Sequence, residues 1–417
     1  MPEHSIPPSP SRIRRARVSV GVVFALHGAA QGSFATRIPW LKDHLDLSTA
    51  VLGLALAFPA VGASIAMPLA SRFIHRYGAL AAVRGLLALW CAALALPPLA
   101  PNLVVLCAVF TLFGATAGMA DVAMNAQGVD IERHHGQSIM SGLHGLWSVG
   151  SLTGAALGVG AVHLGLDARL HLPLIGLALL AATPLVCRGL LDIRPEPDEA
   201  PPPRFALPPR SAWLIGAVGM CAILAEGGSA DWSGVYLEDV TGASETVAAA
   251  SFTAFACTMA VARLAGDAVV RRLGPVRTVR ASGVLAVAGG TLVVTAHTPA
   301  QGIAGFGLLG VGIAVVVPLA FAAAGRSGPN PSQAIAGVAT VTYTTGLIAP
   351  TLIGGIGELA SLPASFAVVT AATAVLVVSA GVLGAGGGSA PVASDRTAPI
   401  TSAASDRATR GAAEPLP

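Results

Sequence analysis

Long apolar stretches alternate with short polar ones along almost the whole chain. Twelve of the apolar stretches are long enough for a membrane-spanning helix, which needs roughly 20 residues. We predict spans at residues 18–36, 50–70, 79–99, 103–126, 139–162, 170–190, 212–235, 246–268, 279–297, 301–324, 333–357 and 361–384. Many contain Gly or Pro, which a span tolerates because neighbouring helices satisfy the freed backbone groups. The pattern predicts an all-α integral membrane protein with twelve transmembrane helices.

Positive residues are distributed unevenly over the loops between these spans. With the N-terminus inside, 20 of the 24 Lys and Arg residues fall on inner segments. Only Arg37, Lys42 and Arg169 fall on outer loops, and Arg263 lies within a span. Because cytoplasmic loops are enriched in Lys and Arg, this bias predicts a multi-pass protein of the cell membrane with both termini cytoplasmic.

Polar segments also divide the chain. The longest interruption between spans, "LDIRPEPDEAPPPRFALPPRS", is Pro-rich and has the composition of a linker. We therefore predict a cytoplasmic N-terminal tail at 1–17, a six-helix bundle at 18–190, a cytoplasmic linker at 191–211, a second six-helix bundle at 212–384 and a disordered cytoplasmic tail at 385–417.

Composition agrees with a membrane protein and excludes several other classes. Hydrophobic residues make up 54% of the chain and charged residues 11%, whereas soluble proteins carry roughly 25% charged residues. The excess of Arg over Lys, with abundant Ala and Gly, is typical of a GC-rich bacterial genome. The net charge of +3 comes from positive residues scattered over short loops, which form no basic face for nucleic acid.

Catalytic and metal-binding motifs are missing from the sequence. All five cysteines lie in apolar stretches without the spacing of a metal site, so we interpret them as inert buried thiols. The phosphate-binding loop of ATP-driven motors does not occur, nor does a nucleophile–base pair. We therefore expect no enzyme activity, no metal and no cofactor.

The two halves align when the chain is shifted by 196 residues. The stretch "ASRFIHRYG" at 70–78 then falls on "GDAVVRRLG" at 266–274, and Gly150 falls on Gly346. A duplicated six-span unit of unchanged orientation implies two bundles related by an axis along the membrane normal. The interface between such bundles can enclose a cavity that opens to alternate sides.

The loop "GDAVVRRLGPVR" at 266–277 resembles the signature loop of the major facilitator superfamily, G-D-x-x-x-R-R-x-G-x-x-R. The resemblance covers about residues 15 to 385 and implies the fold of that family. It also implies a gate in which the loop charges contact helix ends at the inner side. The first half carries a weaker copy with Ser71 in place of the aspartate. The gating residues would be Gly266, Asp267, Arg271, Arg272 and Gly274, with Arg76 and Gly78 in the first copy.

The chain more closely resembles the fucose-permease-like and YbjJ-like branch of the family. In that branch an acid in the fourth span is followed four residues later by Asn, as Asp121 and Asn125 are here. The resemblance implies that Asp121 couples transport to protons. The alternative is a structural role in which Asp121 pairs with an inner-loop arginine such as Arg76. A second acid of those permeases is missing, because Ala35 stands at its position in the first span.

Other polar residues lie deep inside predicted spans. Ionisable groups there are costly and therefore indicate function by default. Glu226 is roughly 22 Å into its span and is the second candidate for proton coupling. His27, at roughly 15 Å, lies one turn before Gln31 on the same face, which suits a polar solute. The alternative for His27 is an interhelical hydrogen bond.

The fifth span contributes His144 and Ser148, which share a face. Trp147 and Tyr343 correspond in the repeat and would stack on a sugar ring, with core packing as the alternative. The residues predicted to line the solute cavity are therefore His27, Gln31, Asn125, His144, Trp147, Ser148 and Tyr343.

These features favour a secondary active transporter that moves a small polar solute, such as a sugar, with protons by alternating access. One alternative is proton-driven export of an amphipathic compound, and another is a membrane receptor or scaffold that moves no solute. We expect the partners to be a small-molecule solute, protons and the lipid bilayer, with no nucleic acid, and we expect a monomer.

Overall fold

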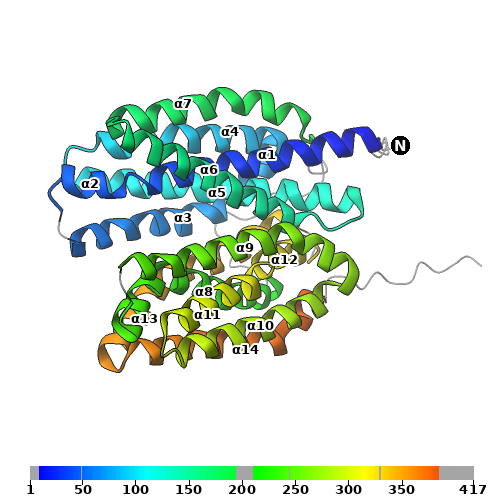
Figure 1. The fold of residues 1–417 in the computed structure, drawn as a ribbon. Helices are drawn as coiled ribbons and strands as arrows, with labels where there is room; N and C mark the ends of the chain where they lie inside the picture. Colours follow the sequence, from blue (N-terminus) through cyan, green and yellow to red (C-terminus); the bar gives the residue numbers. More distant parts are fainter. Residues whose placement is uncertain (1–8, 48, 194–209, 244, 328–329, 385–417) are drawn as a thin grey trace, which may run out of the picture. The chain divides into compact units, whose positions relative to one another are not determined.

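A computed structural model describes residues 9–47, 49–193, 210–243, 245–327 and 330–384, and the structure of these residues is helical throughout (Figure 1). The first half contains α1 (Pro10–Ala35), α2 (Ile38–His44), α3 (Thr49–Tyr77), α4 (Ala79–Ala93), α5 (Leu103–His135), α6 (Met140–His163) and α7 (Ala168–Val186). The second half contains α8 (Arg210–Thr241), α9 (Glu245–Leu273), α10 (Pro275–Val294), α11 (Pro299–Ile313), α12 (Val316–Gly325), α13 (Pro331–Leu359) and α14 (Leu362–Ser379).

Twelve of the described helical segments are long and apolar enough to cross a membrane, which confirms the predicted number. Several are longer than their apolar cores. α1 begins at Pro10, inside the segment predicted as a tail, and α5 continues to His135. Gly136 ends α5 with a left-handed backbone (φ 70°) and donates its N–H to the Glu132 carbonyl. Hydropathy marks only the part of a helix that suits lipid, so the helix itself continues to its cap. Most of the predicted linker and the whole C-terminal tail, 194–209 and 385–417, lie outside the described residues.

The tenth span is two helices, where the sequence predicts one. α11 ends at Ile313 and α12 begins at Val316. Pro318 explains the break, because proline has no N–H to donate to the carbonyl of the residue four positions earlier, Ala314. Interrupted helices of this kind are stable in membrane proteins only where another group satisfies the freed carbonyl.

Helix pairing repeats in the two halves, as the internal repeat predicts. α1 packs on α6 and α3 on α5 in the first bundle, and the equivalent pairs α8 with α13 and α9 with α11 form in the second. Between the bundles, α6 packs on α9 and α3 packs on α13, which is again an equivalent pair. The site described below depends on the contact between α6 and α9.

Glycines allow the closest of these contacts. An added Cβ at Gly28 or Gly32 of α1 would overlap backbone atoms of α6, and one at Gly150 or Gly154 of α6 would overlap backbone atoms of α1. Both helices thus carry two glycines four residues apart, the spacing that lets two backbones approach in a membrane. This packing gives a structural reason for part of the high glycine content.

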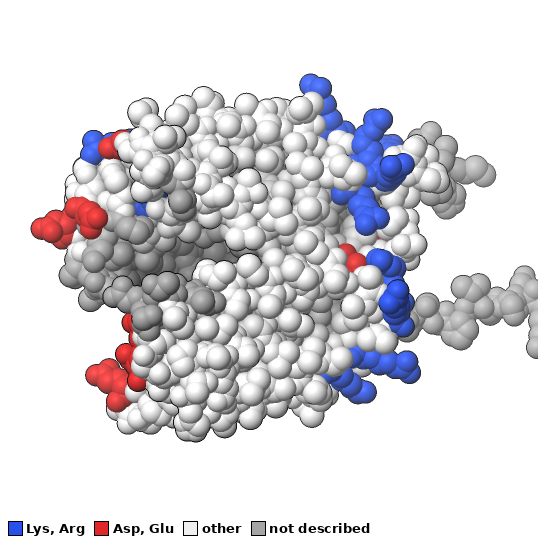
Figure 2. Space-filling view, in the orientation of Figure 1, with Lys and Arg blue, Asp and Glu red and all other residues white. Residues whose placement is uncertain are grey.

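Large apolar side chains remain exposed on the outside of the bundles. Val104, Leu174 and Val378, for example, are 78%, 55% and 79% exposed. In Figure 2 the middle of the molecule is almost free of charge, whereas Lys and Arg gather at one end and most acidic residues at the other. An uncharged belt between charged ends is the surface expected of a protein that crosses a bilayer. The end that carries the basic residues is called the arginine-rich end below.

Candidate functional site

A first polar cluster lies between α5 and α6 in the first bundle. Asp121 occupies the middle turns of α5, is 4% exposed, and accepts a hydrogen bond from Asn125 Nδ2 at Oδ1 (3.2 Å). Asn125 Oδ1 in turn lies 3.2 Å from His144 Nε2. Because the Asn125 amide nitrogen donates to Asp121, its oxygen faces His144, so His144 donates through Nε2. Hydrogen bonds thus connect three of the predicted residues, Asp121, Asn125 and His144, in series.

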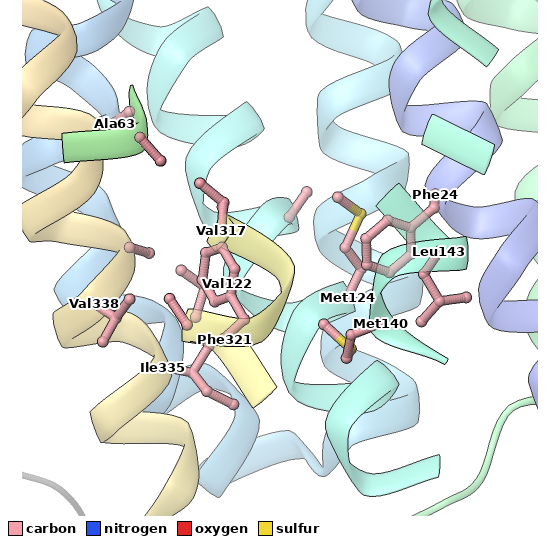
Figure 3. Packing of buried hydrophobic residues seen from close by; sticks show 14 of the residues in the cluster. Phe24, Ala63, Val122, Met124, Met140, Leu143, Val317, Phe321, Ile335 and Val338 are labelled. Atoms are coloured by element: carbon pink, nitrogen blue, oxygen red, sulfur yellow. The ribbon is translucent and has the colours of Figure 1, made fainter. Parts of the chain in front are cut away.

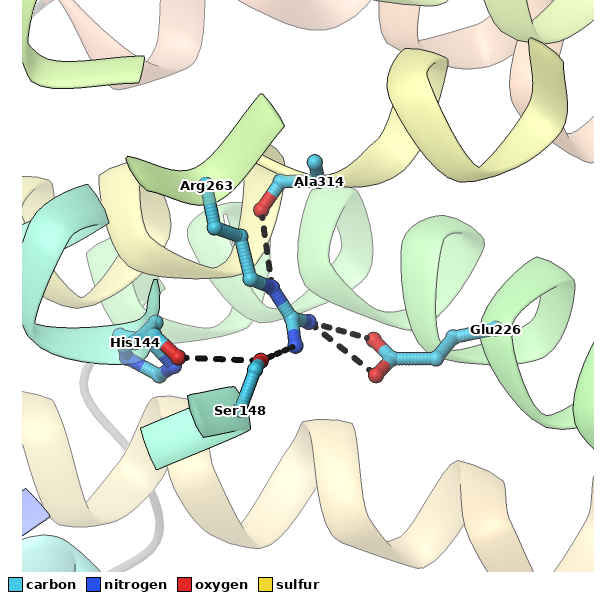
Figure 4. A network of polar contacts seen from close by, with 5 residues as sticks. All are labelled: His144, Ser148, Glu226, Arg263 and Ala314. Carbon is cyan, nitrogen blue, oxygen red and sulfur yellow. Dashed lines mark hydrogen bonds and ion pairs between the residues drawn. The ribbon is translucent and has the colours of Figure 1, made fainter. Parts of the chain in front are cut away.

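A second polar cluster links the two bundles (Figure 4). Arg263 of α9 is 5% exposed and places Nη2 3.1 and 3.0 Å from the two carboxylate oxygens of Glu226 on α8. Its Nη1 donates to Ser148 Oγ of α6 (3.3 Å), and its Nε donates to the Ala314 carbonyl (3.3 Å). Ser148 Oγ donates to the His144 carbonyl (3.2 Å), which brings the two clusters next to each other.

Arg263 is the residue that the sequence analysis missed, because it was assigned only to the interior of a span. The signal that could have found it is its position in "MAVARLAGDA", where an arginine has apolar residues on both sides. A guanidinium that cannot reach water needs an acidic partner in another helix. Glu226, an acid deep inside the seventh predicted span, is a suitable partner of this kind.

His27 forms a hub between helices. Its Nδ1 accepts a hydrogen bond from Trp147 Nε1 (3.0 Å), and its Nε2 lies 3.2 Å from the Ala117 carbonyl and therefore donates to it. The ring also stacks on Trp90, with centroids 5.1 Å apart, and the residue is 5% exposed. Both ring nitrogens are thus engaged, which favours the interhelical alternative over contact with a solute.

The remaining predicted cavity residues are less informative. Gln31 is half-buried, one turn from His27 on α1. The side chain of Tyr343 lies outside the described residues, so its predicted stacking is not tested. Ser229 and Ser233, which follow Glu226 on α8, are fully buried, and their hydroxyl groups have no hydrogen-bond partner among the described residues.

Apolar residues close the space between the polar clusters and the arginine-rich end. Val122 of α5, Met140 of α6 and Val317 and Phe321 of α12 belong to one cluster of buried side chains, drawn in Figure 3. Phe321 stacks on His144 with ring centroids 6.0 Å apart.

Asp267 of the signature loop fastens the two bundles together. Its carboxylate accepts hydrogen bonds from Ser138 Oγ (3.0 Å) and from the backbone N–H groups of Ser141 (3.1 Å) and Gly142 (2.7 Å). These N–H groups open α6, so the negative charge also faces the positive end of the helix dipole. Gly266 allows the approach, because a Cβ there would overlap the Ser141 hydroxyl.

The arginines and the last glycine of this loop make different contributions to the structure. Arg271 and Arg272 are both exposed, and Arg271 Nη1 donates to the Ser138 carbonyl (3.4 Å). Gly274 has φ 76°, a conformation that glycine adopts without strain and that the tight turn between α9 and α10 requires.

The copy of this loop in the first half is different. Gly78 has the same positive φ (82°), so the turn is preserved. Ser71 is 2% exposed and donates to the Pro68 carbonyl of its own helix (3.2 Å). Arg76 is exposed, with its guanidinium 5.5 Å from the Tyr77 ring centroid. Ser71 offers no charge to α13, so the two inter-bundle contacts are unequal.

Glu132 adds a contact at the arginine-rich end that the sequence analysis did not include. Its Oε2 accepts hydrogen bonds from the N–H groups of Ile139 (2.9 Å) and Met140 (3.1 Å), and its Oε1 lies 3.7 Å from Arg326 Nη1. Burial lowers the pKa of Arg326, and the nearby carboxylate of Glu132 opposes that shift. The ion pair joins α5 of one bundle to the end of α12 in the other.

Arg37 lies at the end of α1 that is remote from the arginine-rich end. Its Nε donates to His171 Nδ1 (3.0 Å), and both residues are 3% exposed. Burial lowers the pKa of Arg37, and the negative charge of Asp167 opposes the shift. Arg37, which the sequence places on an outer loop, is thus buried against α7.

Metal binding finds no support in the part of the chain that the structure describes. No group of three or more His, Cys, Asp or Glu side chains there has the arrangement of a metal site. The five cysteines are free thiols. Cys91 and Cys187 are buried as predicted, Cys107 and Cys221 are partly buried, and Cys257 is exposed, so the prediction of a buried thiol is wrong for Cys257.

Comparisons with known proteins agree with this arrangement. The family model of the Major Facilitator Superfamily matches residues 20–225. The uncharacterized transporter y4wD of Sinorhizobium fredii is 34% identical over 87% of this chain and 97% of its own length. An uncharacterized MFS-type transporter of Yersinia pestis is 33% identical over 84% of this chain and 91% of its own length.

Solved structures show the same fold at low identity. The transporter FucP in its outward conformation covers 88% of this chain and 98% of its own, with a TM-score of 0.71 and 15% identity. A variant of the same protein, described as the fucose:proton symporter of E. coli, has a TM-score of 0.69 over the same shares. At this identity the likeness concerns the arrangement of the helices, not the solute.

Proposed function

Because the chain belongs to the major facilitator superfamily of transporters, we propose that it moves a small polar solute across the cytoplasmic membrane together with protons. The family moves solutes and is not a family of enzymes. Proton coupling and the choice of a sugar as the first solute to test are our proposal. The symporter FucP, which has the same fold, supports that choice.

One observation carries this proposal. Polar and charged groups meet in the middle of an otherwise apolar molecule, where α6 packs on α9 across the two bundles. Asp121 and Glu226 are the two carboxyl groups of these clusters, one in each bundle. Charged groups at such depth are costly and are retained where they bind ions or solutes.

The surroundings of the two carboxyl groups suggest different roles. Glu226 is 28% exposed and therefore lies within reach of solvent, whereas Asp121 is buried against Asn125. We propose that Glu226 exchanges protons with solvent in this conformation. Asp121 would exchange its proton after the bundles move apart at the arginine-rich end.

The distribution of charge supports an orientation in the membrane. Arginines gather at one end of the described helices (Figure 2), and cytoplasmic loops are enriched in positive residues. We therefore propose that both termini are cytoplasmic and that the end opposite the arginine-rich end faces outward. In this conformation the contacts of Asp267 hold the cytoplasmic side closed.

Uptake of labelled sugars into proteoliposomes, with and without an imposed pH gradient, tests the proposal. We expect accumulation only with the gradient. Asp121→Asn or Glu226→Gln should abolish gradient-driven accumulation and leave exchange between pre-loaded solutes, because exchange needs no net proton movement. Accumulation that ignores the gradient would remove proton coupling.

Two further outcomes separate the alternatives. Loss of a pre-loaded amphipathic compound from the liposomes under the opposite gradient would indicate export. If no compound moves in either direction, although the protein is folded and reconstituted, the receptor or scaffold function replaces transport.

A further inference from the structure

The break between α11 and α12 depends on a side chain from another helix. Pro318 has no N–H, so it leaves the Ala314 carbonyl without its helical partner. Arg263 of α9 supplies the missing donor through Nε, at 3.3 Å. The bend in the tenth span is therefore held by a charged side chain whose position depends on its other contacts.

Those other contacts lie on two further helices. The guanidinium binds Glu226 of α8 through Nη2 and Ser148 of α6 through Nη1. A guanidinium is planar and its donors have fixed directions, so a displacement that weakens one contact alters the others. Arg263 thus connects the break, its own bundle and the opposite bundle.

Glu226 is the acidic partner of Arg263. The helices packed against α8 are α9, α11, α12, α13, α14 and the short 3-10 helix Ala380–Leu383, which has no charged residue. α11, α12 and α14 contain no Asp, Glu, His, Lys or Arg, and the only such residue of α13 is Glu358 in its last turn. Among the residues that the structure describes, the charged group in contact with Glu226 is therefore Arg263 of α9. His144 of α6 lies beyond Ser148, and Asp231 of α8 is exposed.

The half-helix beyond the break closes the arginine-rich end. All ten residues of α12 are buried, and α12 packs on α5 and α6 of the first bundle. Phe321 stacks on His144, and a Cβ at Gly325 would overlap Val129. Opening this end therefore requires α12 to leave the first bundle.

We propose that Arg263 is the positioning residue that transmits protonation of Glu226 to the break at Ala314. With Glu226 ionised, the bidentate pair holds the guanidinium on Ala314 and Ser148, and α12 stays on the first bundle. Protonation of Glu226 removes the ion pair, the guanidinium leaves the carbonyl, and α12 moves away. This inference rests on the proposed proton-coupled transport and adds the part of the molecule that responds.

Cysteine labelling tests the movement without a transport assay. The full chain, with its five native cysteines replaced, receives Ala324→Cys, a fully buried position on α12. The rate of its reaction with N-ethylmaleimide is measured in proteoliposomes between about pH 5 and about pH 8. Each rate is divided by that of Gln137→Cys, an exposed position, which cancels the pH dependence of the thiol itself. We expect labelling to be about tenfold faster at the low pH, which corresponds to about 1.4 kcal/mol.

Substitutions in the ion pair then identify the cause. Glu226→Gln and Arg263→Gln should label rapidly at both pH values. Arg263→Lys should label as rapidly as Arg263→Gln, because one ammonium group cannot reach Glu226 and Ala314 together. The matched control Arg280→Gln, an exposed arginine on α10, should label like the parent.

Three results would overturn the inference. These are labelling of the parent that does not change with pH, a pH response that persists in Arg263→Gln, and full protection by Arg263→Lys. If the ion-pair variants fail to fold, the pH dependence of labelling in the parent still tests whether α12 moves away from the first bundle at low pH. If labelling behaves as expected and no solute moves, the inference stands and the proposed transport function fails. If solute moves with protons but labelling does not respond as expected, the transport function stands and the role of Arg263 is removed.

Discussion

Replacing Asp267 with Asn should open the arginine-rich end by an amount that the structure allows us to work out. Asp267 is 8% exposed, and its carboxylate accepts two hydrogen bonds from N–H groups in the first turn of α6 and one from Ser138, just before that helix. A hydrogen bond to a charged group contributes about 1.5–3 kcal/mol, and the helix dipole adds about 0.3–1 kcal/mol. Because Asn keeps one acceptor oxygen, we expect a net loss of about 2 kcal/mol, or roughly 30-fold in the ratio of closed to open protein.

Spin-label distances measure that ratio. Labels at His134→Cys and Leu273→Cys, in a background without native cysteines, place one probe at the arginine-rich end of each bundle. We expect one short distance in the parent and an added population at longer distance in Asp267→Asn. Ser71→Ala is the matched control at the equivalent position of the first half.

The control separates a lock from a general weakening of the interface. Ser71 donates to the Pro68 carbonyl of its own helix, so its removal should leave the distances unchanged. Identical distance distributions for the parent and Asp267→Asn would refute the reasoning. So would an equal change in Ser71→Ala, because the two positions would then not differ in function.

Two further predictions concern stability. Gly32→Val should lower the melting temperature by several degrees and reduce the monodisperse fraction, since its Cβ would overlap the Ser151 carbonyl. The control Gly160→Val, on an open face of α6, should change the melting temperature little. Equal losses in the two variants would contradict the close packing of α1 on α6. His27→Phe should destabilise the protein by about 1–3 kcal/mol, because Trp147 Nε1 loses its acceptor. Thermal melts in detergent measure both effects, and an unchanged melting temperature for His27→Phe would show that the hydrogen-bond hub is dispensable.

The sequence predicts most of the fold because the bilayer imposes a strong physical constraint. Each span needs an apolar stretch of a set length, so hydropathy alone locates all twelve. The internal repeat adds the pairing of helices, since duplicated units pack alike. Helix ends beyond the apolar core, such as the end of α5 at His135, depend on local capping and are not visible in hydropathy.

Within the candidate site, the contacts that lie on one helix are the predictable ones. Asp121 and Asn125 are four residues apart, and their contact follows from helix geometry. The pairing of Glu226 with Arg263 joins two helices whose relative rotation is set by packing, so the sequence spacing contains no information on it. Pro318 is visible in the sequence, yet the group that satisfies the freed carbonyl is decided only in the folded protein.

For His27, the sequence predicts the burial of the side chain but not its partners. Its depth in the first span correctly indicates a buried position, 5% exposed. Depth alone does not distinguish a solute ligand from an interhelical hydrogen bond, because both require a polar group away from lipid. Only the positions of Trp147 and Ala117 show that both ring nitrogens are already engaged.

Solute-induced proton movement shows whether this protein carries protons together with its solute. Proteoliposomes in weakly buffered medium receive a candidate sugar while an external dye reports pH. Coupled uptake through Glu226 and Asp121 predicts a rise in external pH when the transported sugar is added, and no rise with Glu226→Gln. Entry of the sugar without any change in external pH would contradict the coupling of sugar uptake to protons.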